Sequence, residues 1–178
     1  MPLKRRRLVS HTSTILLMVF AVCLPMLVPA EGLNQQGLFK IERSKNANII
    51  QYDAQVRPDG RLDRKKPVVA YWIRLAEQGQ VKKLSWIQRT FAYGFKADLN
   101  DDRQSASLRM AADFGRLIKV KKFGQLYGAT IDIDGKPSRL EKIYIDASGK
   151  GLFVTVNYIE LFGSDLIFGE STYEKFFP

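Results

Sequence analysis

Apolar and polar residues alternate with a period of two along most of the chain beyond residue 30. In residues 49–56, every second residue from Ile50 to Val56 is apolar and the residues between them are polar. Successive side chains of a strand point to opposite faces, so this alternation predicts a half-buried β-strand. Residues 68–75 are apolar on both faces, which predicts a strand near the centre of its sheet.

Further segments show strand-like patterning and are mostly separated by glycine or Asp-Gly turns. They are residues 38–43, 95–99, 105–111, 116–123, 126–133, 138–146, 152–162 and 166–176. Asp134-Gly135 predicts a two-residue type I′ hairpin, because Asp and Gly tolerate the positive φ angles that this turn needs. Residues 148–151 and 163–165 predict two more hairpins.

One segment departs from the β pattern. Ser85-Trp86-Ile87-Gln88 has the form of a capping box, in which Ser85 and Gln88 each bond to the other's backbone. We expect a short helix from residue 86 to about residue 92, ending at Gly94. A two-turn helix is marginal alone, so we expect it to pack on the sheet through Trp86, Ile87, Phe91 or Tyr93.

These elements define the expected fold class. About nine short strands with hairpin spacing, one short α-helix and no βαβ rhythm favour an all-β, mainly antiparallel domain. We expect a closed or nearly closed β-barrel, with a β-sandwich as the alternative.

Residues 1–30 have the parts of a secretory signal peptide. Four basic residues at positions 4–7 precede an apolar run over residues 15–28, which is shorter than the roughly 20 residues that span a bilayer. We expect cleavage after Ala30, a single β domain over residues 31–178 without a transmembrane segment, and a periplasmic or extracellular location. The apolar run suits the general secretory route, and Arg5-Arg6-Arg7 keeps the twin-arginine route as the alternative.

The predicted signal contains the chain's single histidine, His11, and its single cysteine, Cys23. Residues 31–178 therefore offer neither an imidazole nor a thiol. This excludes Ser-His-Asp and Cys-His catalysis and metal sites built on histidine or cysteine. We expect no metal and no cofactor.

Charge narrows the choice of partner. Loss of the four leader cations lowers the net charge from +10 to +6. The remaining basic residues lie in loops and along one strand, without a basic helix or an aromatic RNA-binding signature, so we expect no nucleic-acid partner. The expected partner is a small amphipathic or anionic ligand or an envelope component.

The densest group of hydrogen-bonding side chains lies in residues 42–48, between two predicted strands. Arg43 follows Phe39 and Ile41 on one face and offers a planar bidentate donor at a cavity mouth. Together with Arg74 and with Arg89 on the short helix, it would let three guanidinium groups converge on a carboxylate or phosphate. The candidate ligand-binding residues are Arg43, Lys45, Asn46, Arg74, Gln88 and Arg89.

Two alternatives assign these charged residues differently. Arg43 could instead pair with Glu42, Asp53 or Glu160 and only stabilise the turn. Glu160 continues an apolar stripe of residues 152–162, so it is the candidate acid of a carboxylate-dependent enzyme. No second carboxylate can be assigned to it from the sequence, and a rim carboxylate or one end of a structural ion pair is the favoured interpretation, because burial of a lone carboxylate is costly.

Four sequence blocks resemble a bacterial domain-of-unknown-function family, number forty-eight thirty-three. The blocks are LFKIERSKNANIIQYDA at 38–54, DGRLD at 59–63, PVVAYWIRL at 67–75 and LSWIQRTFAYGF at 84–95. The resemblance implies an exported single-domain protein and carries over no activity. Within the blocks it draws attention to Arg43, Lys45, Asn46, Asp53, Tyr71, Gln88 and Arg89.

Together these observations predict an exported, non-catalytic binding or envelope-associated β-barrel module. One alternative is a carboxylate-dependent hydrolase or lyase that acts on envelope polysaccharide, with Glu160 as its acid. The other is a structural interaction protein with a filled core.

Overall fold

The computed structural model describes residues 32–112, 114–150 and 153–178. The predicted signal peptide and its cut after Ala30 lie outside the described residues. Contacts group Glu31–Pro178 into one unit. Its elements are β1 (Asn34–Arg43), β2 (Asn46–Val56), β3 (Val68–Arg74), the 3₁₀ turn η1 (Leu75–Glu77), β4 (Gln80–Lys83), α1 (Trp86–Phe91), β5 (Phe95–Leu99), β6 (Ser105–Met110), β7 (Ile118–Phe123), β8 (Leu126–Ile133), β9 (Lys136–Lys150), β10 (Phe153–Asp165) and β11 (Ser171–Phe176).

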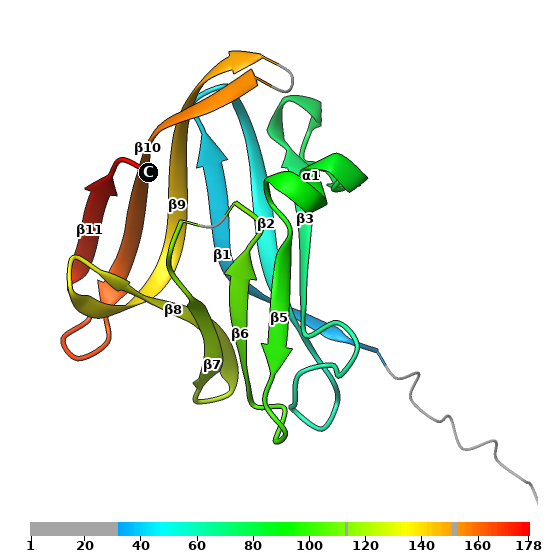
Figure 1. The fold of residues 1–178 in the computed structure, drawn as a ribbon. Helices are drawn as coiled ribbons and strands as arrows, with labels where there is room; N and C mark the ends of the chain where they lie inside the picture. Colours follow the sequence, from blue (N-terminus) through cyan, green and yellow to red (C-terminus); the bar gives the residue numbers. More distant parts are fainter. Residues whose placement is uncertain (1–31, 113, 151–152) are drawn as a thin grey trace, which may run out of the picture. The chain divides into compact units, whose positions relative to one another are not determined.

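All eleven strands belong to one mixed sheet, so the predicted all-β class is confirmed. Its main path runs β4-β3-β2-β1-β9-β8-β7-β6-β5, and β10 and β11 extend from β9 (Figure 1). The prediction of a closed or nearly closed barrel is wrong, because the sheet curls through 235° as an open half-barrel. The end strands β4 and β5 are not paired, and residues 84–94, which include α1, connect them in place of a tight turn.

The sheet branches at the long strand β9. One edge of β9 pairs with β10, and the other edge pairs with β8 over residues 136–139 and with β1 over residues 142–145. The β1–β9 pairing is parallel, and the other strand pairings are antiparallel. Alternation within a strand carries no information about its neighbour, so this branch could not be predicted from the pattern.

The concave inner face of the sheet holds the core. Tyr52 is fully buried and stacks on Phe39, with ring centroids 4.4 Å apart and the planes 8° from parallel. Burial raises the pKa of Tyr52 well above its ordinary value, so its hydroxyl keeps the proton. That hydroxyl donates to the backbone carbonyl of Tyr93 at 2.7 Å and thereby ties the core to the segment after α1.

Of the three predicted hairpin turns, the one at Asp134-Gly135 is confirmed at the predicted position. Asp134 and Gly135 join β8 to β9 with φ angles of 50° and 72°. Residues 148–150 instead belong to β9, and residues 151–152 lie outside the described residues. Residues 163–165 belong to β10, which turns only after Asp165.

A bidentate ion pair attaches the last strand to the rest of the sheet. Arg116 donates two hydrogen bonds to Glu174 of β11, one of them 2.6 Å from Nη1 to Oε2. The same Oε2 accepts the backbone N–H of Asp134 at 2.7 Å. The Arg116 guanidinium lies 4.8 Å over the Phe176 ring. Glu174 therefore links β11 to the β8–β9 turn and to the segment before β7.

Glu174→Gln should lower the free energy of unfolding by about 1–2 kcal/mol at neutral pH, because it removes charge-assisted hydrogen bonds. Arg116 donors, with the Asp134 N–H, hold the pKa of Glu174 below its ordinary value of 4.5. The folded state thus binds this proton more weakly than the unfolded state. The contribution of Glu174 is present above pH 4.5 and is lost as pH falls through the lowered folded-state pKa.

Urea denaturation between pH 7 and pH 3 checks this prediction. The stability gap between the parent and Glu174→Gln should shrink toward acid pH. Glu141→Gln is the matched control, because the Glu141 side chain is exposed on β9 and its loss should change stability by less than about 0.5 kcal/mol. A gap that stays constant with pH would contradict the assignment.

Candidate functional site

Four adjacent strands carry polar side chains where their inner faces leave the core. On β2, Ile50 points into the core and Asn48 and Asn46 continue the same alternation toward the start of the strand. Arg43 lies opposite Asn46 at the end of β1, and Trp72 on β3 lies opposite Ile50. The period of two that buries the core residues therefore also directs this polar group to the concave side of the sheet.

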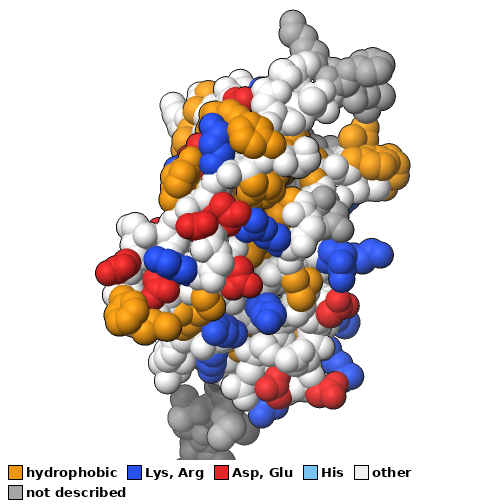
Figure 2. All heavy atoms as spheres, turned by 60° about the vertical axis from the view of Figure 1, so that its left-hand side comes forward, with side chains coloured by type: hydrophobic (Ala, Val, Ile, Leu, Met, Phe, Trp, Pro, Cys, Tyr) orange, Lys and Arg blue, Asp and Glu red, His pale blue; other side chains and the backbone are white. Residues whose placement is uncertain are grey.

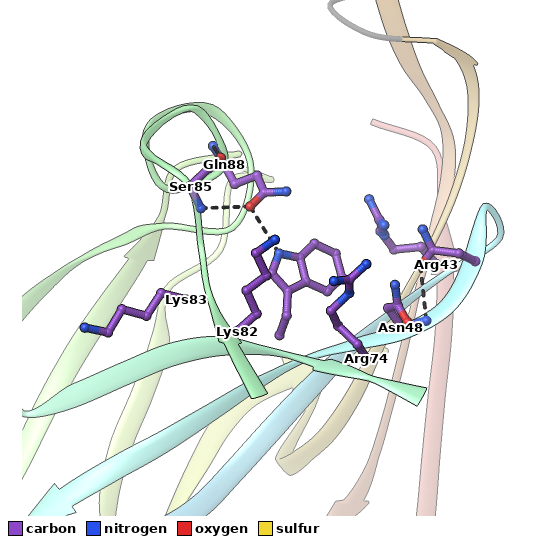
Figure 3. Close-up of a pocket in the computed structure, with 9 residues that line it drawn as sticks. Arg43, Asn48, Arg74, Lys82, Lys83, Ser85 and Gln88 are labelled. Carbon is purple, nitrogen blue, oxygen red and sulfur yellow. Dashed lines mark hydrogen bonds between the residues drawn. The ribbon is translucent and has the colours of Figure 1, made fainter. Parts of the chain in front are cut away.

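A cavity of about 410 Å³ opens at this group. It is lined by Arg43, Asn46, Asn48, Trp72, Arg74, Lys82, Lys83, Ser85 and Gln88. Figure 3 shows Arg43 and Asn48 on one side of the cavity and Ser85 and Gln88 on the other. Arg74 and Lys82 lie between them in this view, and the side chain of Lys83 extends away from the group.

The N-terminus of α1 is held at the cavity by side-chain hydrogen bonds. The predicted capping box is present: Ser85 Oγ accepts from the Gln88 N–H at 3.3 Å, and Gln88 Oε1 accepts from the Ser85 N–H at 2.9 Å. Gln88 Oε1 also accepts from Trp72 Nε1 at 3.1 Å. Gln88 thus connects the helix to β3.

Of the four residues named as alternatives for packing this segment on the sheet, Tyr93 does so and the three within α1 do not. Trp86, Ile87 and Phe91 are 67%, 52% and 66% exposed. Tyr93 alone packs against the core, where its ring meets Trp72 edge to face with centroids 5.5 Å apart. The helix ends at Phe91, and Gly94 is required because a Cβ there would lie 1.7 Å from the Arg89 carbonyl oxygen.

Arg43 is a half-buried cation at the cavity, in contact with two aromatic rings. Its guanidinium carbon lies 4.7 Å from the Trp72 ring centroid and 5.4 Å from that of Tyr93. Nη1 donates to the Tyr93 hydroxyl at 2.6 Å, and the buried Nε has no hydrogen-bond partner. A guanidinium has five N–H donors, so Arg43 keeps donor capacity that its neutral neighbours do not use.

The three carboxylates proposed as alternative partners of Arg43 bind other residues, and Glu160 accepts from Tyr173. Glu42 pairs with Lys40 and with Lys142. Asp53, only 5% exposed, accepts from Gln51 and from Tyr71, the latter at 2.5 Å. The side chains of Asp53, Gln51 and Tyr71 alternate with Tyr52 and Trp72, so they lie on the face of β2 and β3 that is opposite the cavity.

Cations dominate the cavity. Arg43, Arg74, Lys82 and Lys83 line it, and no acidic side chain does. Arg74 pairs with Glu77 of η1. Within the described part of the chain, no ion pair joins Arg43, Lys82 or Lys83 to a carboxylate. Cations with unused donors around a hollow can bind an anionic, oxygen-rich group.

The structure brings together four of the six predicted site residues, namely Arg43, Asn46, Arg74 and Gln88. Arg89 instead lines a second hollow of about 820 Å³ beside β3, β4 and β5. Lys45 points to β9, where its ammonium contacts the Gly149 carbonyl. The three guanidinium groups therefore do not line one cavity.

Sequence reasoning missed several residues of the site. It did not include Lys82 and Lys83, which belong to β4, where Lys82 lies opposite Trp72. It treated Tyr93 as a packing residue and did not connect it with Arg43. The alternation that places Trp72 and Arg74 on one face was the available signal for Trp72.

Glu160 lies on the outer face of β10, away from the cavity lining. Its carboxylate accepts from the Tyr173 hydroxyl at 2.8 Å and lies 3.9 Å from Lys175 Nζ. Figure 2 shows acidic, basic and hydrophobic side chains mixed on the face that brings β10 and β11 forward. These contacts match the structural ion pair that the sequence left as one interpretation of Glu160.

Two general findings concern the described residues. Within them, no helix is long and apolar enough to cross a membrane. The same residues contain no group of three or more His, Cys, Asp or Glu side chains placed to hold a metal ion.

Comparison with known proteins gives one match. Residues 39–175 match the family described as "Domain of unknown function (DUF4833)", in agreement with the four sequence blocks. No curated protein and no solved structure matches significantly. Because the match covers most of the chain, the protein belongs to the DUF4833 family.

Proposed function

We propose that the protein is a non-catalytic binding module whose basic cavity holds the phosphate group of an amphipathic ligand. In the exported setting predicted by the leader, that ligand is an envelope component. The observation that carries the proposal is Arg43, a half-buried guanidinium with an unpartnered Nε and no carboxylate partner among the described residues.

The surroundings of Arg43 support an anion in two ways. The Trp72 and Tyr93 rings hold the guanidinium in position, which lowers the conformational entropy lost when it binds a ligand. Arg74 and Lys82 add positive charge on the same side of the sheet. A tetrahedral phosphate can accept from several of these donors at once.

Isothermal titration calorimetry with glycerol 1-phosphate tests the proposal. Arg43→Gln should weaken binding by about 10- to 100-fold, because a hydrogen-bonded charge contributes roughly 1.5–3 kcal/mol. The substitution also removes the bond from Nη1 to the Tyr93 hydroxyl, so the free energy of unfolding should fall by about 1–2 kcal/mol and the variant should remain folded.

Arg109→Gln is the matched control, because it removes the same charge from an exposed position on β6. It should bind like the parent. Equal affinity in Arg43→Gln and the parent, or no binding by the parent, would overturn the proposal.

A further inference from the structure

Helix α1 exposes an apolar surface that nothing in the described chain covers. None of its six residues is buried, and Trp86, Ile87 and Phe91 are all more than half exposed. The Trp86 and Phe91 rings contact each other at 90° with centroids 6.1 Å apart. Here the term apolar tip denotes Trp86, Ile87 and Phe91.

The apolar tip adjoins the basic cavity. Ser85 and Gln88, at the start of the same helix, line the cavity, and Figure 1 shows α1 projecting at one edge of the sheet. Residues 78–97 contain no acidic side chain. Their cationic residues are Lys82, Lys83, Arg89 and Lys96. The exposed aromatic residues therefore lie in a stretch of the chain in which every charged residue is a cation.

This combination of charge and exposed apolar residues matches a lipid surface. Tryptophan favours the headgroup region of a bilayer, where its ring is partly in apolar surroundings, and nearby lysine and arginine residues attract anionic lipids. Three side chains on a six-residue helix offer far less area than the roughly 1,000 Å² that a stable protein interface buries.

We propose that α1 docks the protein on an anionic phospholipid bilayer, with the apolar tip inserted among the headgroups and a lipid phosphate in the basic cavity. The occupancy of the cavity rests on the function proposed above. The insertion of the tip rests on its own exposure and on the adjacent cations. Apolar insertion and electrostatic attraction together stabilise an association that either alone would leave weak.

Co-sedimentation with phosphatidylglycerol and phosphatidylcholine vesicles tests the docking. The parent should bind phosphatidylglycerol vesicles and bind phosphatidylcholine vesicles much more weakly, and added salt should weaken the binding. The double variant Trp86→Ser with Phe91→Ser should lose about 10- to 100-fold in vesicle affinity while remaining folded, because both side chains are exposed.

The matched control is Ile167→Ser with Phe168→Ser. These side chains are 77% and 79% exposed in the turn between β10 and β11, and neither lines the cavity. The control should bind vesicles like the parent. An equal loss in both double variants, or none in the tip variant, would overturn the docking proposal.

The two tryptophans provide a direct readout. Trp72 is buried at the cavity and Trp86 is exposed, so the emission that Trp86→Phe removes from the parent spectrum is that of Trp86. With saturating phosphatidylglycerol vesicles, its emission should shift to the blue and be quenched by bromine-labelled acyl chains. An unchanged Trp86 spectrum with vesicle-bound protein would overturn insertion.

Failure of the docking and failure of the proposed function give different results. If the tip does not insert, the parent still binds glycerol 1-phosphate in solution, and that binding still depends on Arg43. If the cavity does not bind phosphate, vesicle binding still depends on Trp86 and Phe91 but not on Arg43. Normal glycerol 1-phosphate affinity in the tip variant would show that the tip acts on the membrane and not on the cavity.

Discussion

Tyr52→Ala should lower the free energy of unfolding by about 3–5 kcal/mol, because it leaves a large cavity in the centre of the core. Tyr52 is 0% exposed, stacks on Phe39 and lies 5.9 Å from the Phe95 ring centroid. Phe39 is on β1, in the middle of the strand order, and Phe95 is on β5, at one end of it. The ring therefore fills the space between parts of the sheet that do not pair.

Tyr52→Phe separates the ring from its hydroxyl. This variant keeps the stacking and loses only the bond to the Tyr93 carbonyl, so its cost should be about 1–2 kcal/mol. Urea denaturation at pH 7 measures both variants. A cost below about 1 kcal/mol for Tyr52→Ala would contradict its place at the centre of the core.

Gly163→Ala should destabilise the fold by about 3 kcal/mol, because a methyl group at this position has no room. A Cβ on Gly163 would lie 2.2 Å from the Arg139 carbonyl oxygen and 2.9 Å from Ile133 Cδ1. The register between β9 and β10 shifts between Phe162 and Gly163, so the two backbones must separate to admit the methyl group.

Gly37→Ala is the control for this substitution. Gly37 also lies within a strand, but a Cβ there would meet Gln51 Nε2 at 3.5 Å and Asp53 Oδ1 at 3.8 Å, which are ordinary contacts. Its stability should stay within about 0.5 kcal/mol of the parent. Thermal unfolding of the two variants compares them directly, and equal melting temperatures would contradict the steric argument.

Local sequence signals correctly predicted those parts of the structure that depend on neighbouring residues. The alternation in residues 49–56 predicted a strand, and the structure has β2 there. Asp134-Gly135 predicted its turn, and Ser85 with Gln88 predicted the capped start of α1. Each of these elements depends on groups within a few residues of one another, so a short stretch of sequence is enough to predict it.

The candidate site was predictable in part for the same reason. Arg43 and Arg74 each extend an apolar face of a strand, and the curved sheet brings the ends of those strands to one cavity. Arg89, on the short helix, was predicted to be a third guanidinium of the same site. The phase of α1 instead directs Gln88 to the cavity and leaves Arg89 exposed beside the second hollow.

By itself, the sequence determined the β class, most strand positions, the capped helix and the excess of cations. The tertiary structure alone decided that β9 branches, that the sheet stays open and that the large apolar residues of α1 remain exposed. Strand order and helix packing depend on contacts between distant segments, and a repeat of two residues does not encode which strand lies beside which. Only the tertiary structure decided that Arg43 has no carboxylate partner among the described residues, because Glu42, Asp53 and Glu160 each bind other residues.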